Sequence, residues 1–148
     1  MKSIKKIYIG SDHAGYELKN QLKKYIESLK FDVVDVGVFS PESADYPDIA
    51  KKVAKKVLNN SSAYGLLICG TGIGMSIAAN RFKNIRAAEC ANEKMAELSR
   101  KHNNANILCL GARILNFAAA KKITRKFLQT DFESEARHLR RIKKIEKC

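Results

Sequence analysis

The sequence predicts an α/β fold in which an open parallel sheet of five strands carries helices on both faces and ends in a helical tail. Short apolar segments alternate five times with longer segments whose apolar residues recur every three or four positions, as strands and crossover helices do. The segment at 64–69 is continuously apolar, which is typical of a strand buried on both faces. The chain has 148 residues, 45% of them hydrophobic, so we expect residues 1–148 to form a single domain.

The first half of the chain contains the clearest change of period. Residues 4–10 read as a strand, and after a polar turn the apolar residues recur with helical spacing at positions 18, 22, 25, 26 and 29. Residues 31–36 read as a second strand that Gly37 ends. A polar loop at 38–46 follows, and Pro47 with Asp48 then opens a helix, because Pro is favoured in the first helical turn.

The second half repeats the alternation. The apolar strand ending at Cys69 leads through a glycine-rich turn into a helix that we expect to end near Phe82. The remaining expected elements are a strand at 86–90, a helix at 92–102, a strand at 106–110, a helix at 114–128 and a tail helix at 134–147. Ligands of open parallel sheets bind at the carboxyl ends of the strands, so the informative turns are 11–15, 69–75 and 111–113.

The charge of the chain favours an anionic partner. Its net charge is +13, and residues 113–148 alone hold 11 basic and 4 acidic residues. Nucleic acid, an acidic surface and a phosphorylated small molecule all fit such a balance. The sequence lacks both a run of about 18 apolar residues and an apolar N-terminal leader, so we expect a cytoplasmic protein without a membrane partner. The four cysteines have no CxxC spacing and no neighbouring His cluster, so we expect free thiols and no metal site.

The glycine-rich turn is the strongest candidate for a binding site. The segment Cys69-Gly70-Thr71-Gly72-Ile73-Gly74-Met75 turns tightly from a strand into a helix, which directs several N–H groups to one point and suits an anion or a developing oxyanion. It matches the dinucleotide fingerprint weakly, because the third glycine comes one residue early, and it lacks the Lys of a phosphate-binding P-loop. A plain tight turn remains an equal alternative.

Other residues at the expected strand and helix ends have both a functional and a structural interpretation. Cys69 beside the N–H groups could serve as a base or nucleophile, although most cysteines are simply buried. Asp12 and His13 could cap a helix with the imidazole in solvent, and His102 with Asn103 could end one. The arginines of the second half could simply lie in solvent; they are Arg113, Arg137 and Arg141. Arg137 and Arg141 share a helical face, however, and could both donate hydrogen bonds to one phosphate.

Several blocks recur together in one known family. They are Ser11-Asp12-His13-Ala14-Gly15, Asp45-Tyr46-Pro47, Cys69 to Gly74, Ala78-Ala79-Asn80-Arg81, Arg86-Ala87, Ser99-Arg100-Lys101-His102-Asn103, Asn106, Gly111-Ala112-Arg113 and Arg137-His138. In this order, over nearly the whole chain, they resemble the B-type ribose-5-phosphate isomerases and their galactose-6-phosphate and allose-6-phosphate isomerase relatives. The resemblance implies a Rossmann-like three-layer αβα sandwich, an aldose–ketose isomerisation without metal or cofactor, and a homodimer, or a tetramer, with active sites between subunits.

The resemblance also implies roles for individual residues. Cys69 would be the base, His102 would assist ring opening, and Thr71 with the N–H groups of the glycine turn would steady the enediolate. The substrate-binding residues would be Asp12, His13, Tyr46, Gly70, Gly72, Ile73, Gly74, Asn103, Arg113, Arg137 and Arg141. Ribose 5-phosphate is the expected substrate, and six-carbon sugar phosphates are the alternative. A basic nucleic-acid-binding domain is the alternative from another class, and the resemblance speaks against it.

Overall fold

The computed structural model describes residues 3–148, and its centre is a parallel sheet of five strands in the order β2-β1-β3-β5-β4. The strands are β1 (Lys6–Ser11), β2 (Asp32–Gly37), β3 (Ala63–Cys69), β4 (Ala87–Glu89) and β5 (Ile107–Gly111). Every residue of β3 is buried, as its continuous apolar run predicts for the middle strand. The predicted five-stranded parallel sheet is therefore confirmed.

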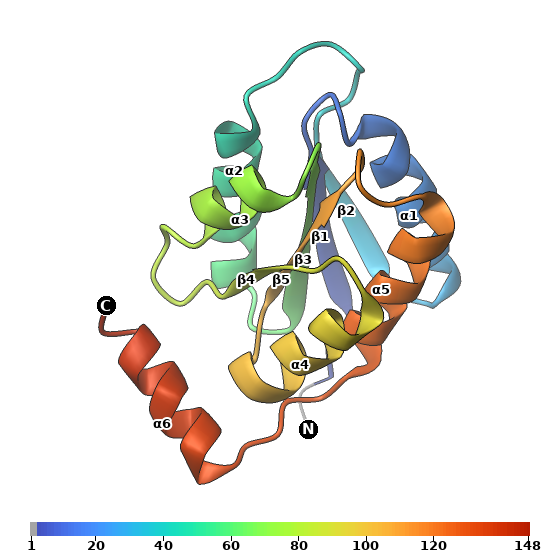
Figure 1. Cartoon of the computed structure of the whole chain (residues 1–148). Helices are drawn as coiled ribbons and strands as arrows, with labels where there is room; N and C mark the ends of the chain where they lie inside the picture. The colour runs from blue at the N-terminus through green and yellow to red at the C-terminus, as the bar shows by residue number, and fades with distance from the viewer. Residues whose placement is uncertain (1–2) are drawn as a thin grey trace.

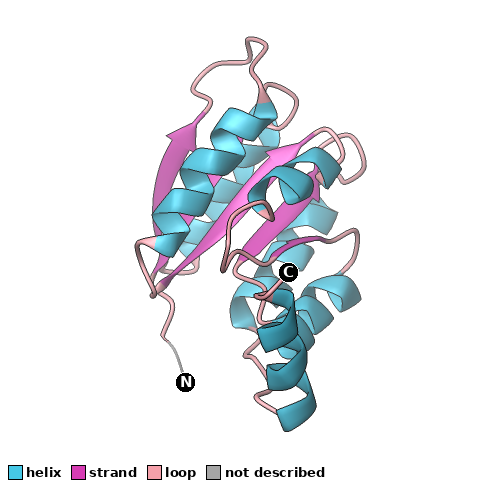
Figure 2. Cartoon of the chain, turned by 90° about the vertical axis from the view of Figure 1, so that its left-hand side faces the viewer, coloured by secondary structure: helices cyan, strands magenta, loops and turns pink. Residues whose placement is uncertain are grey.

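Helices cover both faces of this sheet (Figure 1). They are α1 (Tyr16–Ser28), α2 (Tyr46–Leu58), α3 (Ile73–Ala79), α4 (Glu93–Asn103), α5 (Phe117–Gln129) and α6 (Ala136–Ile145). One apolar core joins α1, α4 and α5 to the sheet, and a second joins α2 and α3 to its other face. The three-layer αβα sandwich is confirmed, and Figure 2 shows helices in front of and behind the strands.

Two predicted helix boundaries in the sandwich are wrong. The helix expected at 114–128 is α5, which begins at Phe117 because the Asn116 side chain caps it by accepting a hydrogen bond from Ala119 N at 2.8 Å. Helix α3 ends at Ala79 rather than near Phe82, because the Asn80 side chain pairs with the backbone of the edge strand β4. The Asn80 side chain accepts a hydrogen bond from Ala87 N at 2.8 Å and donates one to Ala87 O at 2.9 Å, in the way that a neighbouring strand would. A side chain that pairs with a strand edge competes with further helical turns.

The direction of the connections changes between β1 and β3, which is a topological switch point of the sheet. The chain leaves β1 for α1 on one face, whereas it leaves β3 for α3 on the opposite face. Ligands of open α/β sheets generally bind at the carboxyl ends of the strands on either side of such a switch point.

Helix α6 is set apart from the sandwich. It extends from the lower part of the molecule and packs mainly against α4 (Figures 1 and 2). Only its His138 is fully buried, where the imidazole ring lies 4.6 Å from that of His102, centroid to centroid. The predicted tail helix is present, but it is shorter than the expected range 134–147 and contacts the rest of the molecule along one side. Within residues 3–148, no helix is both long and apolar enough to cross a membrane.

Candidate active site

Three turns meet at the carboxyl ends of β1, β3 and β5. The backbone of the β5–α5 turn bonds to that of the glycine turn, with Ala112 N donating to Cys69 O at 2.8 Å and Arg113 N donating to Gly70 O at 2.9 Å. From the other side, Asp12 N donates to Ile68 O at 3.2 Å. The three turns that the sequence indicates are therefore fixed to one another through backbone groups.

The glycines of the turn are required by close packing. Gly72 has a φ of 80°, and a Cβ atom there would lie 2.9 Å from the carbonyl carbon of Leu110. A side chain at this position would meet both backbone strain and a fixed main chain. Gly111 is equally confined, since its Cβ would lie 2.6 Å from Thr71 O. This tight fit turns the chain sharply enough to present the backbone of residues 70–74 at the edge of the sheet.

Cys69 is held at the centre of this turn. Its side chain is 5% exposed, and its Sγ accepts a hydrogen bond from Gly72 N at 3.2 Å. The sulfur thus lies beside a backbone donor at the carboxyl end of β3, where a thiol can act as a base or nucleophile. Thr71, which is exposed, accepts a hydrogen bond on Oγ1 from Ile73 N at 3.2 Å, so its hydroxyl proton is free to donate to a ligand.

The other cysteines near the sheet have a different environment. Burial raises the pKa of Cys90 to about 11 and raises that of Cys109 well above its usual value. Both thiols therefore keep their protons at neutral pH and pack as apolar groups. Cys69 is the cysteine of the sheet with a backbone donor on its sulfur and a place at the edge.

Asp12 and His13 are more constrained than a solvated cap. Asp12 is 6% exposed, and its Oδ1 accepts a hydrogen bond from Gly15 N at 3.1 Å within the turn before α1. The N-cap of α1 is Gly15 and no side chain caps the helix, so the interpretation of Asp12 as a helix cap is wrong. The interpretation of His13 as a free imidazole is wrong, because its Nδ1 accepts a hydrogen bond from Ala44 N at 3.2 Å. An accepting Nδ1 leaves the proton of the neutral ring on Nε2, where it can be donated to a ligand.

Tyr46 and Arg113 border the glycine turn on two sides. A Cβ on Gly74 would lie 2.6 Å from Cζ of Tyr46, so the phenol ring lies directly on that glycine. A Cβ on Gly70 would lie 3.0 Å from Nη1 of Arg113, so the guanidinium lies over the start of the turn. The site consequently combines a thiol, backbone donors and an exposed cation within one small region.

A buried lysine supports the loop that contributes Tyr46 and holds His13. Lys19 is 0% exposed, and its Nζ lies 2.9 Å from Asp35 Oδ1 and donates to the carbonyl of Val38. The aromatic ring of Phe39 covers the ammonium at 5.3 Å. The sequence analysis did not single out Lys19, although its position on the buried side of α1, between Leu18 and Leu22, was a detectable signal.

The second group of predicted residues lies at the opposite edge of the sheet. Gly65 at the start of β3 pairs with Ile107, whereas Cys69 pairs with Gly111, and β5 begins just after α4 has returned to the amino-terminal edge. Gly65 and Cys69 are four residues apart, which is about 13 Å along the strand at about 3.3 Å per residue. His102 and Asn103, at the end of α4, are therefore more than about 13 Å from Cys69. Arg137 and Arg141 are exposed on α6 still farther from the sheet (Figure 1). One chain therefore does not bring all the predicted site residues together.

The fold and the site together define an α/β enzyme with a thiol and a glycine-rich turn at the carboxyl ends of the strands of a parallel sheet. Comparison with known proteins gives its family. The sequence profile of the family described as Ribose/Galactose Isomerase matches residues 7–145. Ribose-5-phosphate isomerase B of Escherichia coli K12 is 41% identical over 142 residues, which cover 96% of this chain and 95% of that protein.

Solved structures show the same likeness. The crystal structure of a ribose 5-phosphate isomerase from Thermotoga maritima superposes with a TM-score of 0.94 at 51% identity and covers 97% of this chain and 98% of its own. Ribose-5-phosphate isomerase B of Clostridium thermocellum gives a TM-score of 0.93 at 45% identity, with 96% and 95% covered. The chain belongs to the ribose/galactose isomerase family, in its B-type ribose-5-phosphate isomerase branch, and is an isomerase.

Proposed function

We propose that the protein interconverts ribose 5-phosphate and ribulose 5-phosphate through an enediolate, with Cys69 as the base and without a metal or cofactor. The observation that carries the proposal is the Cys69 sulfur at the carboxyl edge of β3 with Gly72 N–H directed at it. The names of the relatives support the choice of substrate, since those from E. coli and T. maritima are ribose 5-phosphate isomerases.

The proposed proton transfer uses one face of the sugar. The Cys69 thiolate takes the proton from C2 of the open-chain aldose, and the electron pair moves to the carbonyl oxygen, which becomes negative. Thr71 and the backbone donors of residues 70–74 stabilise this oxyanion, because donors already in place need no reorganisation as the charge develops. The hydroxyl proton on O2 passes to O1, and the thiol returns its proton to C1 as the C2–O bond becomes a carbonyl, which gives the ketose and restores the thiolate.

Binding of the phosphate aligns the reacting carbons with the thiol. Arg113 offers a planar fork of donors that fits phosphate geometry, and His13 offers the Nε2 proton fixed by its bond to Ala44. An anchor remote from the reacting carbons limits their motion and converts binding energy into rate. Asp12 and Tyr46, on either side of the turn, would contact the sugar hydroxyls.

The group formed by His102, Asn103, Arg137 and Arg141 would complete the site of a second copy in a homodimer. Exposed apolar side chains on the faces that such a dimer would use support this arrangement. Ile73 and Ile77 of α3 are 55% and 63% exposed, and Leu139 and Ile145 of α6 are 41% and 46% exposed. Exposed apolar residues of this size on neighbouring turns mark an association surface.

An isomerase assay tests the reaction and its substrate. The purified protein is given ribose 5-phosphate, allose 6-phosphate or galactose 6-phosphate in parallel, and the ketose formed is measured by a coupled reaction after treatment with a chelator. We expect the highest kcat/KM with ribose 5-phosphate and no loss on chelation. Preference for a six-carbon substrate, or binding of nucleic acid that weakens steeply with salt and no turnover, would contradict the proposal.

Mixed dimers test the shared site. A Cys69→Ala subunit and a His102→Asn subunit, co-expressed with two different tags and purified by both, form a dimer in which one site keeps both wild-type residues. We expect about half of the wild-type activity per dimer, since one of two sites is intact. A mixed dimer as inactive as its two parents would place Cys69 and His102 in the same subunit's site.

A further inference from the structure

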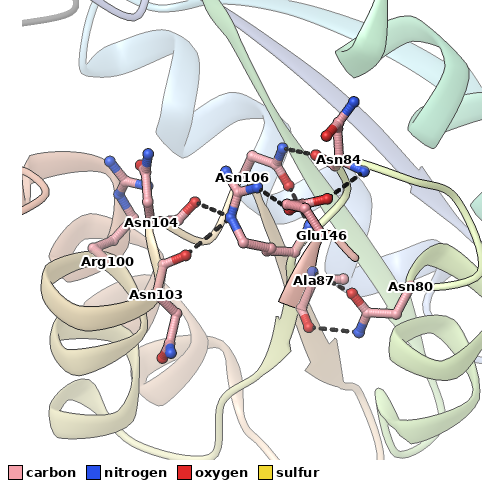
Figure 3. A network of polar contacts seen from close by, with 9 residues as sticks. Asn80, Asn84, Ala87, Arg100, Asn103, Asn104, Asn106 and Glu146 are labelled. Carbon is pink, nitrogen blue, oxygen red and sulfur yellow. Dashed lines mark hydrogen bonds and ion pairs between the residues drawn. The ribbon is translucent and has the colours of Figure 1, made fainter. Parts of the chain in front are cut away.

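Arg86, directly before β4, bonds to the end of α4 and to the end of α6. Figure 3 shows the polar network around this junction, with the carbonyls of Asn103 and Asn104 and the carboxylate of Glu146 directed toward one another. The Nε of Arg86 donates to the carbonyl oxygens of Asn103 and Asn104 at 3.0 and 3.1 Å, and its Nη1 lies 2.5 Å from Glu146 Oε1. The Arg86 backbone is fixed as well, because its N–H donates to Asn106 Oδ1 at 2.8 Å and its carbonyl accepts from Asn106 N at 2.9 Å. One guanidinium thus joins two helix ends to a rigid strand.

Glu146 anchors the far end of α6 in this junction. Its Oε2 accepts a hydrogen bond from Asn84 N at 2.9 Å, so the carboxylate is held by a cation and by a backbone donor. The side chains of Arg86 and Glu146 are only 17% and 20% exposed. A shielded ion pair with additional hydrogen bonds has a fixed geometry, which distinguishes it from an exposed pair on flexible side chains.

The near end of α6 is held separately. Glu133 N donates to Lys101 O at 3.1 Å, and the ring of His138 lies against that of His102. A helix of ten residues is about 15 Å long, so contacts at one end leave the direction of its axis undetermined. The Arg86–Glu146 contact supplies the second fixed point, because it ties the other end of α6 to α4 and β4.

The residues joined by this contact are adjacent to the second group of site residues. The Asn103 carbonyl that Arg86 holds belongs to a predicted substrate-binding residue, and His102 precedes it. Arg137 is the second residue of the helix that Glu146 ends, and Arg141 lies about one turn farther along it. Neither Arg86 nor Glu146 has been placed in contact with substrate, so any effect on the reaction is indirect.

We propose that Arg86 and Glu146 are positioning residues: they fix the angle between α4 and α6 and so align His102 and Asn103 with Arg137 and Arg141 for the active site of the partner subunit. The inference rests on the shared site proposed above. It requires that loss of the contact weaken phosphate binding in the partner's site while the site of the same subunit keeps its Cys69 half intact.

The test variant is Glu146→Gln, with Lys147→Gln as its control. Gln keeps an acceptor for Asn84 N–H and removes the charge that holds Arg86, whereas Lys147→Gln removes a charge from the adjacent exposed residue. We expect Glu146→Gln to raise KM for ribose 5-phosphate about tenfold with a smaller change in kcat, since a small displacement of anchoring groups has effects of this order. Glu146→Asp should recover part of the loss, and Lys147→Gln should behave as wild type.

Mixed dimers assign the effect to one half of the site. A dimer of Glu146→Gln and Cys69→Ala subunits should show about half of wild-type activity with a wild-type KM, because its working site takes α4 and α6 from the Cys69→Ala subunit. A dimer of Glu146→Gln and His102→Asn subunits should keep the raised KM and show about half of the Glu146→Gln activity. Purification by both tags ensures that only assembled dimers are measured.

Three results would overturn the inference. The first is a wild-type KM for Glu146→Gln, and the second is a wild-type KM in its mixed dimer with His102→Asn. The third is an inactive Cys69→Ala and His102→Asn mixed dimer, which removes the shared site itself. Only the third result concerns the Cys69→Ala and His102→Asn dimer. Failure of the positioning role of Arg86 and Glu146 can therefore be distinguished from failure of the proposed function.

Discussion

The Sγ of Cys69 accepts a hydrogen bond from the N–H of Gly72 at 3.2 Å, within a turn that only glycine at position 72 can form. The bond links backbone geometry to the thiol, because the residue that donates it has a left-handed φ of 80°, which glycine adopts without strain. The reactivity of Cys69 is therefore a property of the turn.

Substitution of Cys69 tests this connection. We expect Cys69→Ala to fold and to bind substrate while kcat falls about 10² to 10⁴-fold, the usual contribution of a positioned base. Steady-state kinetics with ribose 5-phosphate and a binding measurement by calorimetry give the two quantities. The matched control is Cys109→Ala, which removes a buried thiol one strand away and should lower the free energy of unfolding with little change in kcat. Near-normal turnover in Cys69→Ala would remove the thiol from the mechanism.

Alkaline pH should destabilise the protein through Cys90. Its pKa is raised to about 11 by burial, so between roughly pH 9 and pH 11 the unfolded chain loses this proton while the folded chain keeps it. The unfolded state then binds fewer protons, and the free energy of unfolding falls as pH rises. Urea titrations at pH 8 and pH 10.5 should show a smaller fall in Cys90→Ala than in wild type, by an amount on the order of 1 to 2 kcal/mol. Equal falls in both would contradict the assignment.

His102 should matter most for cyclic substrate. A neutral imidazole can exchange a proton with the ring oxygen and O1 near neutral pH, which opens the furanose before isomerisation. His102→Asn should therefore lose far more kcat/KM with ribose 5-phosphate, which is mainly cyclic, than with the open-chain ribulose 5-phosphate assayed in reverse. Losses of the same size in both directions would indicate that the imidazole is structural, for example through its contact with His138.

The arginines of α6 should govern phosphate binding. Each charged hydrogen bond to phosphate contributes roughly 1.5 to 3 kcal/mol, so Arg141→Ala should raise KM about 10- to 100-fold. Arg141→Lys should recover only part of this loss, because an ammonium lacks the guanidinium fork. Arg140→Ala, one residue away on the same helix, is the control for a change in net charge. A double Arg137→Ala, Arg141→Ala variant with unchanged KM and kcat would return the arginines to the solvent-exposed interpretation.

Lys19 should be important for both stability and binding. Removal of one member of a buried ion pair costs roughly 3 to 5 kcal/mol because the remaining charge is unpaired. Lys19→Met should show such a loss in urea unfolding, and Asp35→Asn added to it should recover a part. In the surviving folded fraction KM should rise, since the loop that holds His13 has lost its support. Lys24→Met, on the exposed side of the same helix, should change the free energy of unfolding by less than about 0.5 kcal/mol.

The sequence was sufficient to predict the helices and strands and to locate the turns between them, because the hydrophobic period and the placement of glycines are local properties of the chain. It predicted β3 as the middle strand from its apolar run and identified the turns at 11–15, 69–75 and 111–113 as the functional edge. It could not predict the helix end at Ala79, because the cause is a pairing of Asn80 with β4, seven residues away in the chain.

The sequence alone could not show that the predicted site residues fall into two separate groups; this became visible only in the structure. The blocks around His102 and Arg137 are as recognisable in sequence as those around Cys69, but spacing along the chain does not tell which edge of a sheet a helix end returns to. The contacts of Lys19 with Asp35 and of Arg86 with Glu146 were missed for a related reason. They join residues 16 and 60 positions apart, and charged residues at such separations carry no pairing signal in a single sequence.

The loop between β2 and α2 is fixed by groups that lie outside it. Lys19 holds the carbonyl of Val38 at one end and His13 holds the amide of Ala44 at the other, while residues 40–43 between them are exposed. Both anchors bind the backbone of the loop, so they tolerate almost any side chain within it. Mutations at these four positions can accumulate without disturbing the thiol or the phosphate-binding groups. This stretch is accordingly where the sequence can vary most freely while the two ends of the loop keep their places.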